Sequence, residues 1–533
     1  MECYESRRKE PDVVVKGTRL TDVVDCRSGA ADRWYQPAVA GVVAGWGLLA
    51  LATVDIRGWW FTELPTVHAG RLTFIDMLYD RAAHGHCPLY FSGSWLLQRI
   101  VGESTVWLRL PAVLAGMIAL VLLARLARRM IGPFGSLMAL LFFAAGPFLL
   151  HVSQLARPYS LVLVFGLMSL LVLAEGNGSV KGRRAVIFGV VTLLGLLTSH
   201  VYWFVFLAEI LWLVVRPKPR FVMVAGGLIG AIVSSIWVLF TFYFVPERAG
   251  ELSLLPWIPP LALDSVIALP GRLFFGIEPF ALPRVGLGTA LLSLIVLVPA
   301  TIGSIRLIRQ DLGSAEGEGS LIVVAGIGSI VVGLVAGLLG WGNLAWVPRY
   351  FIISAACMVI VMAAGCLRLR LFPRVVAVSL LLALVTATFF YLHQESGDVA
   401  RRTAAMINDL GSGDERVVII GKRNMANMAR FYLGKPIIKA EVGDTKRADH
   451  SGEFGSGPKI RKKFQGVWIL MDDTAMINLS ITGDQVFDAV EFVEMTGHRF
   501  PDREEFNLRG HHLIHLWKDP MATTQHGDPS RDD

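Results

Sequence analysis

The residues of this sequence best able to do chemistry are polar side chains beside long apolar segments. Glu63 follows Trp59, Trp60 and Phe61 and precedes a proline, so we expect it where the chain leaves an apolar layer. A carboxylate shielded from water can have its pKa raised enough to act as a general base. Glu63 is therefore either a base or an ordinary interfacial charge, and Asp76 in the same segment is the reserve candidate.

Two arginines stand at the ends of other apolar segments. Arg157 lies between Gln154 and Tyr159, and Arg349 is followed by Tyr350. A guanidinium presents a planar fork of donors that matches phosphate oxygens. One such arginine more often reaches toward lipid headgroups, but two at segment ends indicate an anionic ligand.

His86 precedes Cys87 and Pro88 and could bind a metal ion or a phosphate, or satisfy a loop carbonyl. The five cysteines have no metal-binding spacing, so we expect neither a disulfide framework nor a zinc knuckle. We expect no fixed cofactor and leave a divalent metal ion open.

Composition identifies the elements that must hold these residues. Of 533 residues, 54% are hydrophobic and 17% charged, and the mean hydropathy is +0.54. Apolar runs long enough to cross about 30 Å of hydrocarbon recur between residues 39 and 390, which excludes a soluble enzyme. The net charge of +7 is typical of basic cytoplasmic loops, so it does not indicate nucleic-acid binding.

The apolar runs predict about eleven membrane-spanning helices. Basic residues gather in alternate connections, so the positive-inside rule places the N-terminus in the cytoplasm and the C-terminal region on the extracytoplasmic side. We expect the membrane to be the cell (inner) membrane. The predicted spans cover residues 37–54, 106–124, 133–150, 159–175, 185–200, 201–215, 221–245, 286–305, 321–340, 351–366 and 375–391.

The predicted organisation has four parts: a cytoplasmic segment (1–36), a transmembrane region (37–394), an extracytoplasmic α/β domain (395–520) and a disordered tail (521–533). Two outer loops, 55–105 and 246–285, are too long to be plain connections, and we expect the second to be mobile and to lie on the membrane. In the C-terminal region, patterning predicts strands at 416–420, 467–471 and 511–517 and helices at 398–410 and 424–433.

The order of these motifs resembles the C-type glycosyltransferases, and most of all the family 39 protein mannosyltransferases and their bacterial relatives, which include aminoarabinose transferase. The resemblance covers roughly residues 37–395 and rests on Glu63 after aromatic residues, on the His86 motif, on Leu108-Arg109-Leu110-Pro111, on the segment from Gln154 to Tyr159 and on Arg349-Tyr350.

The resemblance implies a membrane enzyme that transfers a sugar, with inversion, from a polyprenyl-phosphate carrier to an acceptor hydroxyl of a protein, lipid or glycan outside the cytoplasm. Arg157 and Arg349 would bind the donor phosphate, and Glu63 or Asp76 would be the catalytic carboxylate. The cavity would be lined by Thr62, His86, Gln154, Tyr159 and Tyr350. Expected partners are the lipid-linked sugar, its acceptor and membrane lipids.

One departure from the family bears on activity. Family members have an Asp-Glu pair where this chain has Thr62-Glu63, and threonine cannot accept the proton. Either Glu63 or a neighbour such as Asp55 or Asp76 has taken over that role, or the chain is a non-catalytic protein that binds or transports a lipid-linked sugar. A ligase or polymerase of lipid-linked glycans has the same topology and stays an alternative.

Overall fold

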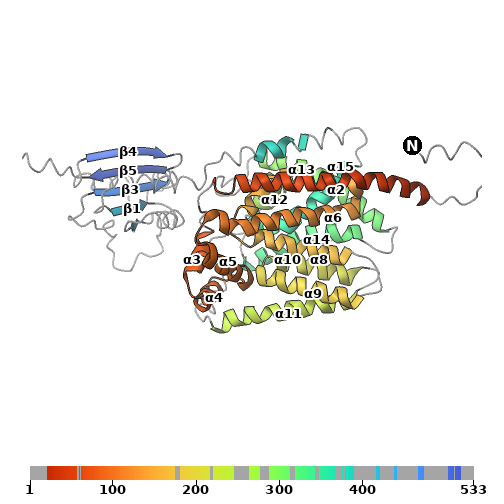
Figure 1. Cartoon of the computed structure of the whole chain (residues 1–533), viewed down its shortest axis with the longest axis horizontal. Helices are drawn as coiled ribbons and strands as arrows, with labels where there is room; N and C mark the ends of the chain where they lie inside the picture. The colour runs from red at the N-terminus through yellow and green to blue at the C-terminus, as the bar shows by residue number, and fades with distance from the viewer. Residues whose placement is uncertain are drawn as a thin grey trace, which may run out of the picture.

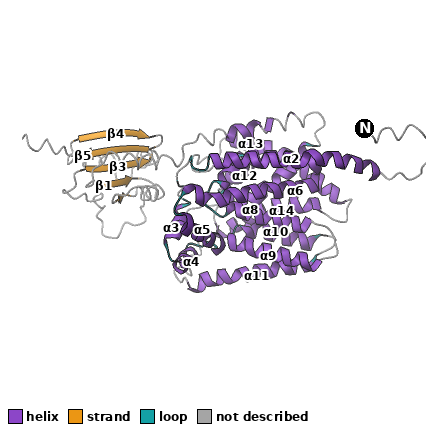
Figure 2. Ribbon diagram, in the orientation of Figure 1, coloured by secondary structure: helices purple, strands orange, loops and turns teal. Residues whose placement is uncertain are grey.

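The body of the protein is a bundle of helices, with three short helices gathered at one end (Figures 1 and 2). The computed structural model describes residues 21–56, 59, 62–174, 181–216, 220–244, 263–275, 287–312, 318–341, 347–367, 375, 379–380, 382–388 and the five strands given below.

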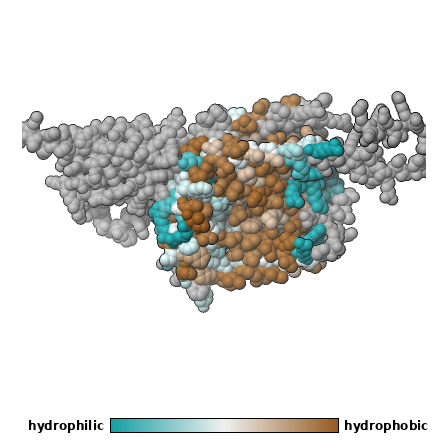
Figure 3. Space-filling model, in the orientation of Figure 1, coloured by the Kyte–Doolittle hydropathy of each residue, from teal (hydrophilic) through white to brown (hydrophobic). Residues whose placement is uncertain are grey.

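Six helices of this part are long and apolar enough to cross a membrane. They are α2 (Thr21–Ala52), α6 (Thr105–Ala145), α11 (Phe221–Phe244), α13 (Leu287–Leu312), α14 (Glu318–Ala336) and α15 (Ile352–Cys366), the last together with the 3-10 turn Pro348–Phe351 that precedes it. Three further bundle helices are α8 (Tyr159–Ala174), α9 (Lys181–Thr198) and α10 (Tyr202–Val215). Figure 3 shows apolar residues across the middle of the bundle and polar ones toward its ends, so the chain is a multi-pass membrane protein.

The predicted count of eleven spans is not confirmed. Two predicted spans, 106–124 and 133–150, fall largely within α6, which consists of two helices that meet at a kink. Gly132 breaks its helical geometry with φ 76°, a left-handed value that glycine adopts without strain, and Pro133 follows. The predicted span at 375–391 lies partly outside the described residues.

Helix α15 is the most enclosed of the long helices, and every one of its residues is buried. It approaches α13 so closely that a Cβ added at Gly303 would clash with the backbone carbonyl oxygen of Val361. Small residues permit this approach, which brings helix backbones together where no hydrophobic effect drives association. Because α15 is packed on all sides, it holds the residues that precede it, including Arg349, in a fixed position.

The first predicted outer loop is built from α3 (Leu64–Arg71), α4 (Phe74–Ala83) and α5 (Pro88–Val101). The Thr73 hydroxyl caps α4 by accepting from the backbone N–H of Asp76 at 3.2 Å. Arg71 pairs with Glu103 at 2.7 Å and joins α3 to the segment that precedes α6. These contacts make residues 62–104 an ordered platform.

Part of the second predicted loop is a buried helix, α12 (Leu263–Phe275), which packs against α13 and against α7 (Pro147–Ser153). Our expectation of a mobile, membrane-lying loop is therefore wrong for residues 263–275. The reason is an apolar face that includes Leu269, Leu273 and Phe274, all buried. The other residues between 246 and 285 lie outside the described part.

The C-terminal region contains a five-stranded sheet in the order β2-β1-β3-β5-β4. The strands are β1 (Arg416–Ile420), β2 (Ile437–Ala440), β3 (Gly466–Asp472), β4 (Asp502–Leu508) and β5 (His511–Trp517). β1 pairs in parallel with β2 and β3, whereas β5 is antiparallel to β3 and β4.

Three of the five strands, β1, β3 and β5, confirm the predictions. β2 and β4 were missed because one is four residues long and the other, DREEFNL, is mostly charged. The two helices predicted at 398–410 and 424–433 lie outside the described residues.

Candidate functional site

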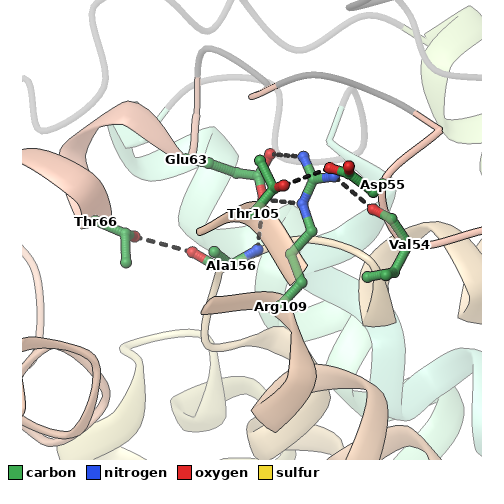
Figure 4. Close-up of polar contacts among 7 residues, drawn as sticks. All are labelled: Val54, Asp55, Glu63, Thr66, Thr105, Arg109 and Ala156. Atoms are coloured by element: carbon green, nitrogen blue, oxygen red, sulfur yellow. Dashed lines mark hydrogen bonds and ion pairs between the residues drawn. The ribbon is translucent and has the colours of Figure 1, made fainter. Parts of the chain in front are cut away.

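Glu63 is the fully buried residue that precedes α3, at the point where the chain enters the short-helix platform. Its carboxylate receives two hydrogen bonds from Arg109 of α6, from Nε to Oε1 at 2.9 Å and from Nη2 to Oε2 at 2.6 Å. The backbone N–H of Ala156 adds a third, to Oε1 at 2.6 Å (Figure 4). Glu63 thus joins three segments that are far apart in the sequence.

Arg109 extends this network of hydrogen bonds to the turn after α2. Its Nη1 donates to the carbonyl oxygen of Val54, in the turn after α2, at 2.7 Å, and its guanidinium lies 5.4 Å from the ring centre of Trp59. The side chain is 2% exposed. A buried ion pair needs further hydrogen bonds to offset its desolvation, and both partners have them. The sequence motif Leu-Arg-Leu-Pro resembled the family, but its spacing did not indicate that Arg109 pairs with Glu63.

The turn at residues 154–158 is held from two sides. Gln154 donates through Nε2 to the Ala50 carbonyl at 3.1 Å and to the Thr53 hydroxyl at 2.6 Å, both near the end of α2. The Thr66 hydroxyl of α3 donates to the Ala156 carbonyl at 2.9 Å. The turn therefore holds Arg157 in place against the platform.

Arg157 is buried, and its Nε and Nη1 have no hydrogen-bond partner among the described residues. Its positive charge acts on both Tyr159 and Tyr350. Arg349 donates from Nε to the Tyr159 hydroxyl at 3.1 Å, so the two arginines share one phenol although they lie in different parts of the chain. The predicted pair of arginines is thus brought together, and buried donors of Arg157 face no acceptor in the described part.

His86 lies beside this group. Its ring centre is 5.1 Å from that of Phe91, and its backbone carbonyl accepts a hydrogen bond from Trp237 Nε1 of α11 at 3.1 Å. Burial, followed by the positive charges of Arg157 and Arg81, holds the pKa of His86 well below its usual value. The imidazole is therefore neutral at physiological pH.

Among the described residues, no group of three or more His, Cys, Asp or Glu side chains is arranged to hold a metal ion. Burial raises the pKa of Cys87, next to His86, to about 12, which leaves it a protonated thiol at neutral pH. Neither residue has the partners of a metal ligand within the part of the chain that the structure describes.

The other predicted site residues have diverse positions. The Thr62 hydroxyl oxygen is buried and has no hydrogen-bond partner within the described ranges. Asp76 is exposed and accepts a hydrogen bond from the Thr73 hydroxyl at 2.6 Å, which occupies it at the start of α4. Asp55 is also exposed, and it accepts a hydrogen bond from the Thr105 hydroxyl beside the Glu63–Arg109 pair (Figure 4).

Two residues that sequence reasoning missed have a place in this site. Arg109 pairs with Glu63, and Arg81 of α4 lies near Arg157. Both are arginines that are nearly fully buried, and burial is not visible in a sequence. Arg109 stands in the Leu108-Arg109-Leu110-Pro111 motif, which carried the resemblance but did not indicate its ion pair, and Arg81 has only the neighbouring Asp80 as a sequence signal.

Comparison with known proteins agrees with this architecture. Residues 85–242 match the family of dolichyl-phosphate-mannose-protein mannosyltransferases. Among curated protein sequences, none matches the chain. The crystal structure of ArnT from Cupriavidus metallidurans bound to undecaprenyl phosphate is similar with a TM-score of 0.54 and 13% identity, over 90% of this chain and 97% of that one.

The apo structure of the same ArnT gives a TM-score of 0.52 and 14% identity, over 91% of this chain and 98% of that one. At these identities the likeness concerns the fold. The resemblance inferred from the order of the polar motifs is therefore confirmed: the chain has the fold of the C-type glycosyltransferases and resembles the family 39 mannosyltransferases and aminoarabinose transferase.

Proposed function

We propose that the protein is a glycosyltransferase that moves a sugar from a polyprenyl-phosphate carrier to an acceptor hydroxyl on the extracytoplasmic side of the cell membrane. The observation that supports it most is the pair Arg157 and Arg349, buried around one phenol, with two nitrogens of Arg157 lacking a partner among the described residues. Buried charged donors are costly unless they meet an anion. A carrier phosphate supplies the oxygens that match them.

The mechanism needs few groups, because a polyprenyl phosphate is already a good leaving group. Arg157 and Arg349 would stabilise the charge that develops on the departing phosphate. A carboxylate would take the proton from the acceptor hydroxyl as its oxygen attacks the sugar carbon from the opposite side, which inverts that centre.

The geometry bears on which carboxylate this is. A base must offer a free lone pair to the acceptor, but the oxygens of Glu63 accept three hydrogen bonds and the side chain is fully buried. Asp55 is exposed. It lies two residues after Thr53, whose hydroxyl accepts a hydrogen bond from Gln154. We therefore propose Asp55 as the base and Glu63 as a positioning residue, with Asp76 kept as the alternative.

Transfer from a purified polyprenyl-phosphate sugar tests the proposal. We expect Asp55→Asn to lower the rate by about 10² to 10⁴ with little change in carrier affinity, as for loss of a positioned base. Asp76→Asn is the comparison, since it removes a carboxylate from the same outer region. Loss of turnover in Asp76→Asn alone would move the base to Asp76.

A second candidate function is non-catalytic binding of a lipid-linked sugar. It is favoured by Thr62, which stands where the family has its aspartate and whose buried hydroxyl has no described partner. No turnover by the unmutated protein with any lipid-linked sugar, together with retained binding of polyprenyl phosphate, would establish it. Transfer gained by Thr62→Asp in such a parent would show that only the base was lost.

A further inference from the structure

Arg81 is a buried arginine of α4 that the mechanism above does not use. Its side chain is 2% exposed, and its Nε donates to Asp80 Oδ2 at 2.9 Å, with a second bond from Nη2 to the same oxygen. The remaining nitrogen, Nη1, is buried and has no hydrogen-bond partner in the described part of the chain. The N–H groups of Nη1 are therefore donors that no described residue of the chain uses.

Arg81 and Arg157 lie against the same aromatic ring. Their guanidinium carbons are 5.2 Å and 5.8 Å from the ring centre of Phe91. The two charges are close enough that Arg157 contributes to lowering the pKa of Arg81, after burial, which is the larger cause. Like charges held together in a buried place repel, and an anion between them relieves that repulsion.

The surrounding charges leave a positive surplus among the described residues. Asp80 faces Arg81 and also lies 3.3 Å from the exposed His84. Glu63 is matched by Arg109, and His86 is neutral because of its lowered pKa. Among the described residues, Asp80 is the carboxylate that faces Arg81 and Arg157, so one positive charge of these two arginines is in excess. Three of their buried nitrogens, Nη1 of Arg81 and Nε and Nη1 of Arg157, have no hydrogen-bond partner in the described part of the chain.

Sugar transfer changes the charge on the phosphate. The bond between the sugar carbon and the phosphate oxygen breaks, its electron pair stays on that oxygen, and the acceptor oxygen bonds to the sugar carbon while its proton goes to the base. A phosphodiester with one negative charge thereby becomes a phosphomonoester with two. Interactions that are stronger after this change than before it accelerate the reaction.

Resting on the proposed function, we propose that Arg81 is a third guanidinium of the phosphate site and that this site is matched to the dianionic carrier left after transfer rather than to the monoanionic donor. Arg81 would contribute one charge-assisted bond from Nη1, held in direction by Asp80. Its contribution grows as the leaving phosphate gains charge.

The test compares two probes on the full chain in lipid nanodiscs at about pH 8, where a phosphate monoester is a dianion. The probes are undecaprenyl phosphate and its methyl ester, which carries one charge. We expect the unmutated protein to bind undecaprenyl phosphate at least about tenfold more tightly than the ester, and Arg81→Gln to lose most of this preference. The matched control is Arg99→Gln, an exposed arginine whose Nη2 donates to the Leu72 carbonyl.

Asp80→Asn separates a charge effect from a structural one, because it breaks the same ion pair from the other side. If Arg81 acts through its charge on the ligand, Asp80→Asn raises the positive surplus and increases the preference for the dianion. If the pair only supports α4, both substitutions weaken the binding of both probes equally. That second pattern would overturn the assignment of Arg81.

The two proposals fail in different ways. Absence of binding of either probe to the unmutated protein would remove the proposed function, and the inference with it. Binding of undecaprenyl phosphate with the same affinity and the same preference in Arg81→Gln as in the unmutated protein would remove only the inference. A Lys at position 81 keeps the charge, and we expect Arg81→Lys to retain part of the preference, which Arg81→Gln does not.

Discussion

The pair formed by Glu63 and Arg109 gives a prediction that separates a positioning role from a catalytic one. The substitution is Glu63→Gln, which keeps the shape of the side chain and removes its charge. In the structure it replaces an acceptor of two arginine bonds, at 2.9 Å and 2.6 Å, by a group whose NH₂ faces a donor. Removal of one partner from a buried ion pair costs about 3 to 5 kcal/mol, because the other charge stays buried and unpaired.

Part of that cost is recovered by the geometry of glutamine. The amide oxygen can still accept the N–H of Ala156 or one N–H of Arg109, a bond worth about 1 kcal/mol. We therefore expect Glu63→Gln to lower the free energy of unfolding by about 3 kcal/mol. A base without a positioning role would predict the opposite pattern, with unchanged stability and lost turnover.

The assay is thermal unfolding of the purified protein in one detergent at one scan rate, since unfolding of such proteins is often irreversible. A double variant, Glu63→Leu with Arg109→Met, removes both charges, and we expect it to be more stable than Glu63→Gln. Unfolding of Glu63→Gln at the temperature of the unmutated protein would refute the reasoning. The control is Arg129→Gln, which breaks the exposed pair between Arg129 and Glu318 and is worth at most about 1 kcal/mol.

Three further predictions concern the outer site and the topology. Arg157→Lys and Arg349→Lys keep the charge and lose the planar fork of donors, so each should weaken binding of undecaprenyl phosphate by about 1 to 3 kcal/mol per lost bond in a titration. Unchanged affinity in the double variant would mean that both arginines only contact lipid headgroups. Because burial raises the pKa of Cys87 to about 12, its thiol stays protonated between pH 7 and 9, and maleimide labelling of the folded protein should stay slow as the pH rises; rapid labelling would contradict this burial. In a cysteine-free background, a cysteine at Lys218 should react with an impermeant reagent only after the membrane is opened, whereas one at Glu103 should react from outside; the reverse would invert the topology.

The general architecture could be predicted because it depends on local patterns. Long apolar runs predict membrane helices from hydropathy alone, and the motif around Arg157 lies within residues 85–242, which match the mannosyltransferase family. Strands β1, β3 and β5 could be placed because short apolar runs stand out in a polar region.

What could not be predicted depends on pairing across the fold. A lone carboxylate after aromatic residues looks the same whether it is a base or half of a buried pair, and only the position of Arg109, on another helix, distinguishes the two. Arg81 follows Asp80 and lies in no motif, so nothing in the neighbouring sequence predicts that its side chain is buried against Phe91. The positive φ of Gly132, which divides α6 between two predicted spans, likewise could not be predicted, because the residue type alone does not determine its backbone angle.

The contacts of the site also determine when it can form during synthesis of the chain. Glu63 emerges first and has no buried cation until Arg109, 46 residues later, and the N–H of Ala156 is 93 residues away. Arg349 reaches Tyr159 across 190 residues, so the platform of short helices can fold well before the second arginine exists. A ribosome that stops before residue 347 would therefore release a chain with an assembled platform of short helices and with Arg81 and Arg157 but not Arg349.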